Sequence, residues 1–127
     1  MPHKRVMIVD DDKEFLEELK ETLSLNGYDV NAVSEAARAF SEATESDPDI
    51  ILLDLKMEGM TGFEIANKLK CFPKTMQIPI IAMSGFFTEN EDVTLLGFFD
   101  IRHYLQKPFS PQEVVKRIES LLKTKDN

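Results

Sequence analysis

The stretch RVMIVDDDKEF, residues 5–15, joins an apolar run to three consecutive aspartates. The β-branched and aliphatic residues 6–9 are typical of a buried strand. Asp10, Asp11 and Asp12 follow it at once, and two such charges about 4 Å apart repel by about 4 kcal/mol at an effective dielectric of about 20. A chain tolerates this repulsion when the carboxylates are solvated, when one of them caps a helix, or when a cation lies between them. Which of these three explanations applies to Asp10, Asp11 and Asp12 depends on the other residues that lie near them in the fold.

The bulk composition narrows the class of protein. A length of 127 residues suits one globular domain with a sizeable core. The net charge of -8, from 23 acidic and 15 basic side chains, argues against direct binding to nucleic acid or to anionic membranes. The single cysteine fits a reducing compartment, and the chain has neither a signal peptide pattern nor a membrane-spanning run. We expect a cytoplasmic protein.

Two kinds of pattern alternate along the chain. Short apolar or alternating runs predict five strands, at residues 5–9, 28–33, 50–53, 78–83 and 102–107. Helical spacing predicts five helices: from Asp12 to about residue 26, from an N-cap at Ser34 with Ala36, Ala37, Phe40 and Ala43 inward, over 62–71, from about Thr88, and from Ser110–Pro111.

This alternation predicts an α/β fold, a parallel sheet covered by helices on both faces. The first, third and fourth strands are the most apolar and belong in the centre, with the second and fifth outside them. The resulting order 2-1-3-4-5 is that of the flavodoxin-like, doubly wound five-stranded sheet with five helices.

Polar side chains follow the central strands where they end. In such a sheet, ligands bind outside the carboxyl ends of the strands. The first strand is followed by Asp10 and Asp11, the third ends at Asp54, the fourth at Ser84 and the fifth at Lys107. Clustered oxygen ligands of this kind suit Mg²⁺, which is held by one or two carboxylates together with phosphate oxygens. A cation would offset the repulsion among the acids.

Each of these residues also has a simpler interpretation. We assign Asp12 to the N-cap of the first helix, whereas for Asp10 or Asp11 alone capping and metal binding are both open. Asp54 alone could begin a turn, Ser84 is followed by a glycine as in many turns, and a lone lysine such as Lys107 is usually solvated. Their occurrence at four strand ends of one topology favours a common site.

At this level of detail the chain resembles a response regulator receiver domain, the phospho-accepting module of two-component signalling. The resemblance covers essentially the whole chain and is carried by VMIVDDD (6–12), IILLDLKMEGMTGFE (50–64), IPIIAMSG (78–85) and HYLQKPF (103–109). It implies a single receiver domain over residues 1–127, with a core of about 4–123 and no output domain in the chain.

The resemblance also implies a role for each motif residue. Asp54 would be the phosphoacceptor, with Mg²⁺ (or Mn²⁺) held by Asp10, Asp11, Asp54 and the backbone carbonyl of Lys56. The phosphoryl group would contact Ser84, the backbone of Gly85 and Lys107, whose bond to Pro108 is expected to be cis. Ser84 and Tyr104 would form the switch, and Lys56 and Phe86 would tune the rate of dephosphorylation, for which we expect a slow reaction.

The implied partners are a sensor histidine kinase or phosphotransfer protein, and an output protein that binds the surface of the fourth helix, fifth strand and fifth helix. The chain would be a monomer or a dimer favoured by phosphorylation, and no enzyme toward a separate substrate. Glu58 and Thr61 depart from the family, which often has proline and aspartate there, and so do Asp100 and Ile101, where it often has Gly-Ala.

Two other functions are compatible with part of the pattern. A haloacid-dehalogenase-like phosphatase also uses a strand-end aspartate, Mg²⁺, a hydroxyl and a lysine, and Asp10 with Asp12 could supply its Asp-x-Asp motif. That family needs a further acidic pair after the lysine, and here only Glu113, Glu119 and Asp126 remain. A docking module that is never phosphorylated is the other alternative, but it would need none of the acids, Ser84 or Lys107.

Overall fold

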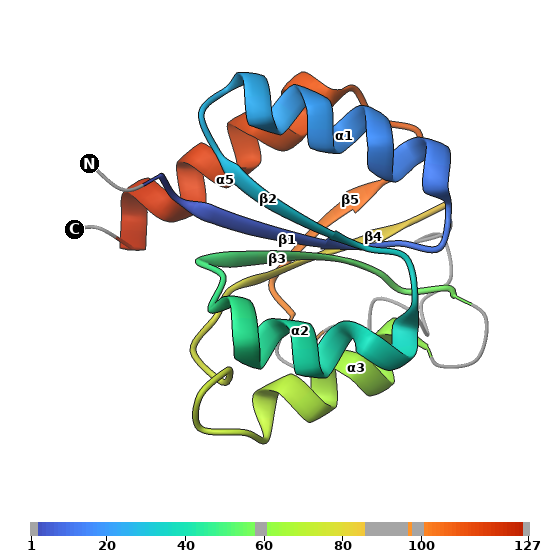
Figure 1. Cartoon of the computed structure of the whole chain (residues 1–127), viewed down its shortest axis with the longest axis vertical. Helices are drawn as coiled ribbons and strands as arrows, with labels where there is room; N and C mark the ends of the chain where they lie inside the picture. Colours follow the sequence, from blue (N-terminus) through green and yellow to red (C-terminus); the bar gives the residue numbers. More distant parts are fainter. Residues whose placement is uncertain (1–2, 58–60, 86–96, 98–100, 126–127) are drawn as a thin grey trace.

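A five-stranded parallel sheet forms the centre of the molecule in the computed structural model, which describes residues 3–57, 61–85, 97 and 101–125. Its order is β2-β1-β3-β4-β5, as predicted (Figure 1). The strands are β1 (Arg5–Val9), β2 (Asp29–Val33), β3 (Ile50–Asp54), β4 (Ile80–Ser84) and β5 (His103–Gln106). The outer strands are the more polar β2 and β5. An outer strand pairs with only one neighbour and is less buried, so it tolerates polar side chains.

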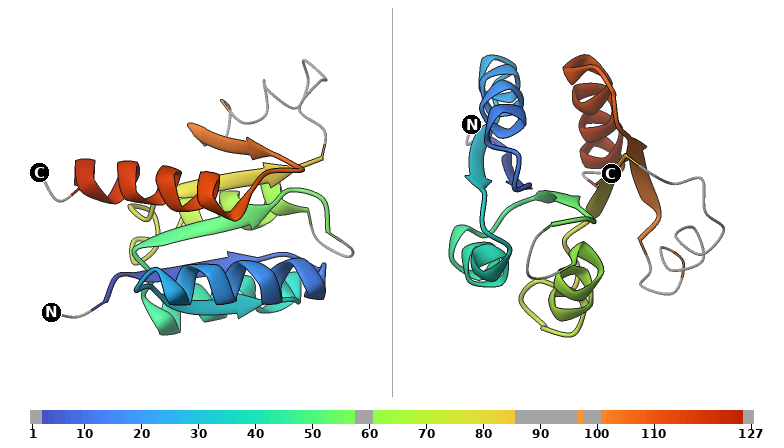
Figure 2. Two further views of the ribbon diagram at one scale, coloured as in Figure 1. Left: turned by 90° about the horizontal axis from the view of Figure 1, so that it is seen from above. Right: turned by 90° about the vertical axis from the view of Figure 1, so that its right-hand side faces the viewer.

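Helices cover both faces of this sheet. Figure 1 shows α1 (Lys13–Leu25) and α5 (Pro111–Lys125) above it, and α2 (Ala39–Ser46) and α3 (Gly62–Lys70) below it. The two further views of Figure 2 show the same layering from above and from the side. The helix expected from about Thr88 lies outside the described residues, and so does the part of the expected partner surface that this helix would supply.

Alternation along the strands divides the core into two layers. In β1, Val6 and Ile8 pack with the buried leucines of α1 and with α5, whereas Met7 and Val9 pack with α2 and α3. The central strand β3 is buried along its whole length. Each large aliphatic side chain buried in this way contributes roughly 1.5–3 kcal/mol to the stability of the fold. The two core layers therefore fix the positions of the strand ends relative to one another.

Side-chain caps begin most of the helices where the sequence predicts. Asp12 accepts a hydrogen bond from the Phe15 N–H of α1 at 3.2 Å, and Thr61 accepts one from the Glu64 N–H of α3 at 3.2 Å. Ser110 Oγ accepts one from the Glu113 N–H of α5 at 3.3 Å. These bonds satisfy backbone donors that have no partner within the helix.

The second helix differs from its prediction. A 3-10 turn, Ala36–Arg38, comes first, and the α-helical part begins only at Ala39. The chain stays extended through Glu35 (φ -116°, ψ 120°), so Ser34 is not the cap, and Ala37 points to solvent. The tighter turn changes which alanine faces the core, because three residues rather than 3.6 complete one revolution. Ala39 and Ala43 are the buried positions.

Among the residues that the structure describes, no helix combines the length and the apolar character that crossing a membrane requires.

Candidate functional site

The sequence-predicted site lies at the carboxyl edge of the sheet, and strand register explains why. Val9 of β1 pairs with Leu53 of β3, so the next residue of each strand, Asp10 and Asp54, lie side by side at the carboxyl end of the sheet. Ser84 pairs with Gln106 across β4 and β5, and the Lys107 N–H donates to the Ser84 carbonyl at 2.7 Å. The backbone ladder therefore brings together residues that lie up to 97 positions apart.

Three carboxylates converge there. Asp10, Asp11 and Asp54 each present an oxygen, and these atoms all lie within 4.8 Å of one another. The three are not equivalent, since Asp10 (0% exposed) and Asp54 (5%) are buried and Asp11 is exposed. Oxygen atoms at this separation suit a hard divalent cation such as Mg²⁺, which commonly keeps several waters, and the exposure of Asp11 leaves this side of the cluster accessible to solvent.

Both oxygens of Asp10 have a partner within the protein. Its Oδ1 accepts the Asp12 backbone N–H at 3.0 Å, and its Oδ2 lies 2.6 Å from the ammonium of Lys107. A buried carboxylate requires such partners, because burying an unpaired charge is very unfavourable. With its oxygens already engaged, Asp10 fits a role at the rear of a cation site, while Asp11 and Asp54 fit direct ligation.

Asp54 is electrostatically perturbed. Burial, and next to it the negative charge of Asp10, raise the pKa of its carboxyl from 3.8 to about 6. The Lys56 backbone N–H, which donates to Asp54 Oδ1 at 3.2 Å, and the charge of Lys107 oppose this rise in pKa, while Asp11 adds to it. A strongly perturbed acid at a strand end is a frequent property of functional sites.

The structure describes all but one of the other predicted site residues. Ser84 is buried (1% exposed) at the end of β4, and Gly85 follows it at the surface. Lys56 is exposed just beyond β3, and Tyr104 on β5 is 44% exposed. The Lys107–Pro108 bond is cis, as expected. Phe86 lies outside the described residues.

Two residues of the site escaped prediction from sequence. Phe15, in the first turn of α1, lies with its ring centroid 4.4 Å from Lys107 Nζ. Gly62 begins α3 so close to β3 that a Cβ there would lie 2.6 Å from Leu55 Cα and would overlap the Asp54 carbonyl oxygen. Only the glycine in TGFE (61–64) gave a signal of the second contact.

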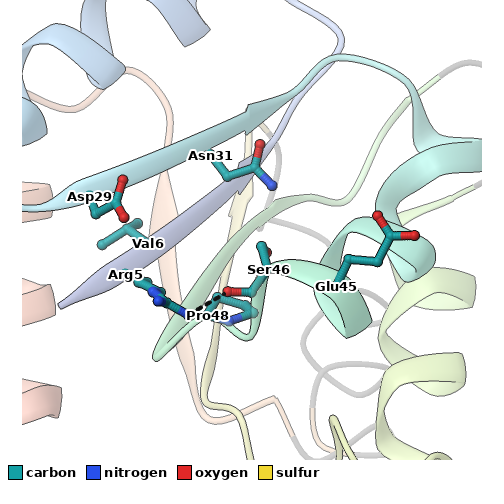
Figure 3. A pocket seen from close by; sticks show the side chains of 7 residues that line it. All are labelled: Arg5, Val6, Asp29, Asn31, Glu45, Ser46 and Pro48. Atoms are coloured by element: carbon teal, nitrogen blue, oxygen red, sulfur yellow. Dashed lines mark hydrogen bonds between the residues drawn. The ribbon is translucent and has the colours of Figure 1, made fainter.

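A hollow of about 330 Å³ lies at the other end of the sheet, near the amino ends of β1 and β2 (Figure 3). It is lined by Arg5 and Val6 of β1, by Asp29 and Asn31 of β2, and by the end of α2. The Arg5 guanidinium donates to the Ser46 carbonyl at 3.2 Å, the dashed line in Figure 3. Because Arg5 begins the strand that Asp10 follows, this hollow is separate from the carboxylate site.

Comparison with known proteins identifies the family. The response regulator receiver domain model matches residues 6–119. The chain belongs to this family. The match makes it a receiver domain of two-component signalling and gives no support to the phosphatase alternative.

Curated relatives of this receiver domain are response regulators. The phosphate regulon transcriptional regulatory protein PhoB of Pseudomonas aeruginosa is 34% identical over 125 residues, 97% of this chain and 53% of that protein. The DNA-binding response regulator MtrA of Mycobacterium tuberculosis is 31% identical over 98% of this chain and 53% of that protein. The receiver domain thus spans about half the length of these relatives.

Solved structures share its fold. The chemotaxis protein CheY4 of Vibrio cholerae has a TM-score of 0.88 and 25% identity, over 94% of this chain and 98% of that one. A CheY-like receiver domain from Methanospirillum hungatei has a TM-score of 0.91 at 24% identity, over 98% of both chains, which shows the common fold. The predicted fold class is confirmed.

Proposed function

We propose that this receiver domain accepts a phosphoryl group on Asp54, in a Mg²⁺-dependent reaction, from a phosphohistidine of a sensor histidine kinase or phosphotransfer protein. The observation that carries the proposal is the convergence of three carboxylates within 4.8 Å with an ammonium 2.6 Å from one of them. An Asp54 oxygen would bond to phosphorus as the P–N bond breaks, and the imidazole would keep the electron pair. Positioning and charge neutralisation govern such transfers.

Asp54 suits the role of nucleophile. With a pKa of about 6 its carboxylate is mostly ionised at neutral pH, and the Lys56 N–H on Oδ1 orients it. Burial strips water from the nucleophile while leaving the Asp11 side of the site open to solvent. These properties favour attack from a fixed direction.

Mg²⁺, with Mn²⁺ as a substitute, fits the donor set. We assign Asp11, Asp54 and the Lys56 backbone carbonyl to direct ligation and Asp10 to ligation through water, since both Asp10 oxygens have protein partners. When bound, the ion would supply positive charge to the phosphoryl oxygens. Ser84, the Gly85 backbone and Lys107 would supply the remaining donors, and the ladder bond between Lys107 and Ser84 keeps them adjacent.

Ser84 and Tyr104 form the proposed switch. The Ser84 hydroxyl would turn to the phosphoryl group and the Tyr104 ring, 44% exposed, would move inward, a two-state shift biased by one hydrogen bond. The altered surface, of the fourth helix, β5 and α5, would then bind an output protein or favour a dimer. Identical chemical shifts of Ser84 and Tyr104 in free and phosphorylated protein would contradict this switch.

Lys56 and Phe86 are the residues proposed to set the phosphoryl lifetime. They lie two positions after the proposed phosphoacceptor and after the switch hydroxyl. Phe86 has no hydrogen-bonding group to hold an attacking water, and the ammonium of Lys56 cannot act as a base toward it. The expected loss is slow, and the half-life in Lys56→Asn and Phe86→Glu tests it: unchanged half-lives would exclude the role.

The receiver domain is proposed to act as a cytoplasmic regulator and not as an enzyme. It would catalyse only its own phosphorylation and slow dephosphorylation. Relatives named DNA-binding response regulators are about twice as long, and the net charge of -8 argues against DNA contacts by this chain itself.

Labelling with acetyl phosphate tests the central proposal. Incubated with this donor and Mg²⁺, the protein should gain one phosphoryl group, seen as a mass increase. No label should be gained when EDTA replaces Mg²⁺, or by the Asp54→Ala variant. Asp12→Ala is the matched control, because Asp12 caps α1 and should leave labelling intact. Full labelling of Asp54→Ala would refute the assignment, and an unlabelled but folded wild type would favour the docking module.

A further inference from the structure

The ammonium of Lys107 lies between a carboxylate and an aromatic ring. Its Nζ is 2.6 Å from Asp10 Oδ2 and 4.4 Å from the centroid of the Phe15 ring, which it faces. A distance below about 6 Å from a ring face is the geometry of a cation–π contact. The lysine side chain is only 25% exposed, so this contact has lost part of its hydration.

The Phe15 ring is itself held in place from two sides. Its backbone lies in the first turn of α1, where its N–H donates to Asp12 Oδ1 at 3.2 Å. Its ring meets Phe109 edge to face, with centroids 5.7 Å apart and an interplanar angle of 77°. The ring is half-buried against the core layer of α1 and α5. It therefore presents a fixed face to the ammonium.

A fixed ring matters because lysine is a poor positioning group alone. Its four-carbon stem has many rotamers, and a hydrated ammonium tends to leave a partly buried site. Asp10 holds one side of the ammonium, and the ring face attracts it from another without competing for hydrogen-bond donors. The ammonium keeps its remaining N–H donors for a third group.

We propose that Phe15 is a positioning residue, whose ring holds the Lys107 ammonium at Asp10 and so keeps it beside the phosphoacceptor. The part that concerns reaction rate depends on the proposed phosphorylation of Asp54. Without the ring the ammonium spends less time in the site, and the rate of phosphoryl acceptance falls by the same factor.

A spectroscopic measurement tests the contact without any phosphodonor. Protons near a ring face are shifted upfield, so the Lys107 Hε resonances, assigned by their loss in Lys107→Gln, should be shifted upfield from those of solvated lysines. Phe15→Leu, which keeps apolar volume, should abolish this shift, and Phe15→Tyr, which keeps the ring face, should retain it. A Lys107 resonance at the solvated position in wild type would overturn the proposal.

Labelling kinetics test the consequence. Phe15→Leu should lower the initial rate of labelling by acetyl phosphate about twofold to fivefold, the factor that matches a partly exposed cation–π contact. Phe15→Tyr should restore the rate, and in a Lys107→Gln background Phe15→Leu should lower it no further. Phe40→Leu is a matched control, since Phe40 also has a lysine over its ring, Lys68 at 5.0 Å, and an edge-to-face partner, but belongs to α2 on the other face.

The outcomes separate this proposal from the proposed function. A rate in Phe15→Leu equal to wild type, an equal loss in Phe15→Tyr, or a further loss in the Lys107→Gln background would each show that the ring acts by packing or not at all. Circular dichroism of each variant checks that it is folded. A wild type that keeps the upfield shift but takes no label would refute phosphorylation of Asp54 and still support the contact.

Discussion

At the scale of single residues, the carboxylates share one site but differ in their effect on the stability of the folded state. Asp10 is fully buried and paired with Lys107, whereas Asp11 is exposed. Asp54 is buried beside Asp10, and burial is the main reason that its pKa rises to about 6. A carboxylate whose pKa is higher in the folded protein than in the unfolded chain destabilises the fold where it is ionised. The site is therefore strained by charge in the absence of a cation.

Asp54→Asn should stabilise the metal-free protein at neutral pH. Between about pH 4 and pH 6 the folded state binds more protons at Asp54 than the unfolded chain does, so the stability of the wild type falls as the pH rises through this window and levels off above it. We expect a gain of roughly 1–3 kcal/mol at pH 7.5 that shrinks toward zero near pH 4.

Urea unfolding in EDTA at pH 4.5 and 7.5 measures this difference. Asp12→Asn is the control, because Asp12 is exposed and caps α1, so its replacement should give no pH-dependent gain. An Asp54→Asn protein with the same gain at both pH values would show that the ionised carboxylate is not the source of the strain.

At the scale of elements, the packing of α3 on β3 positions Asp54, the proposed phosphoacceptor. Gly62 donates its N–H to the Leu55 carbonyl at 3.0 Å, and this contact draws the start of α3 onto the backbone that carries Asp54. Thr61 then caps the helix through the Glu64 N–H. The backbones can approach this closely only because residue 62 has no side chain.

Gly62→Ala should destabilise the protein by about 1–3 kcal/mol, the usual cost of an added methyl group in a tightly packed place. The new Cβ would overlap the Asp54 carbonyl oxygen, so α3 or the end of β3 must shift. Gly85→Ala is the matched control, since a Cβ there meets nothing within 4 Å and should change stability by less than about 0.5 kcal/mol. Urea midpoints of the two variants give the comparison, and equal midpoints would contradict the proposed close approach.

At the scale of the whole molecule, five parallel strands bring dispersed acidic and basic residues to one edge of the sheet. The helices on both faces hold the strand ends in place, so the carboxylates cannot move apart to relieve their repulsion (Figure 1). A divalent cation that binds only this arrangement stabilises the folded state by mass action. The stability of the molecule should therefore report on occupation of the site.

Mg²⁺ should raise the free energy of unfolding by about 1.4 kcal/mol at a concentration ten times its dissociation constant. Asp11→Ala should abolish this increase and should raise metal-free stability, because it removes one of the mutually repelling charges beside Asp54. Asp29→Ala, at the other end of the sheet, should retain the full response. Thermal unfolding in MgCl₂, compared with NaCl at equal ionic strength, measures the stabilisation by Mg²⁺. An undiminished response of Asp11→Ala would show that the cation binds elsewhere.

Local patterns in the sequence were enough to predict the alternation of strands and helices, the order of the sheet, the caps at Asp12 and Ser110, and the strand ends that carry Asp10, Asp54, Ser84 and Lys107. These features follow from residue periodicity and from the rules of parallel sheets, which can be applied to short stretches of sequence. The 3-10 turn before α2 was missed, because whether the helix begins at Ser34 depends on how the chain leaves β2. Two features required the tertiary structure: the Lys107 ammonium contacts Asp10 and the Phe15 ring, and Asp54 is buried whereas Asp11 is exposed. Such contacts join residues as many as 97 positions apart, and their geometry depends on how whole helices pack on the sheet, which no local pattern records.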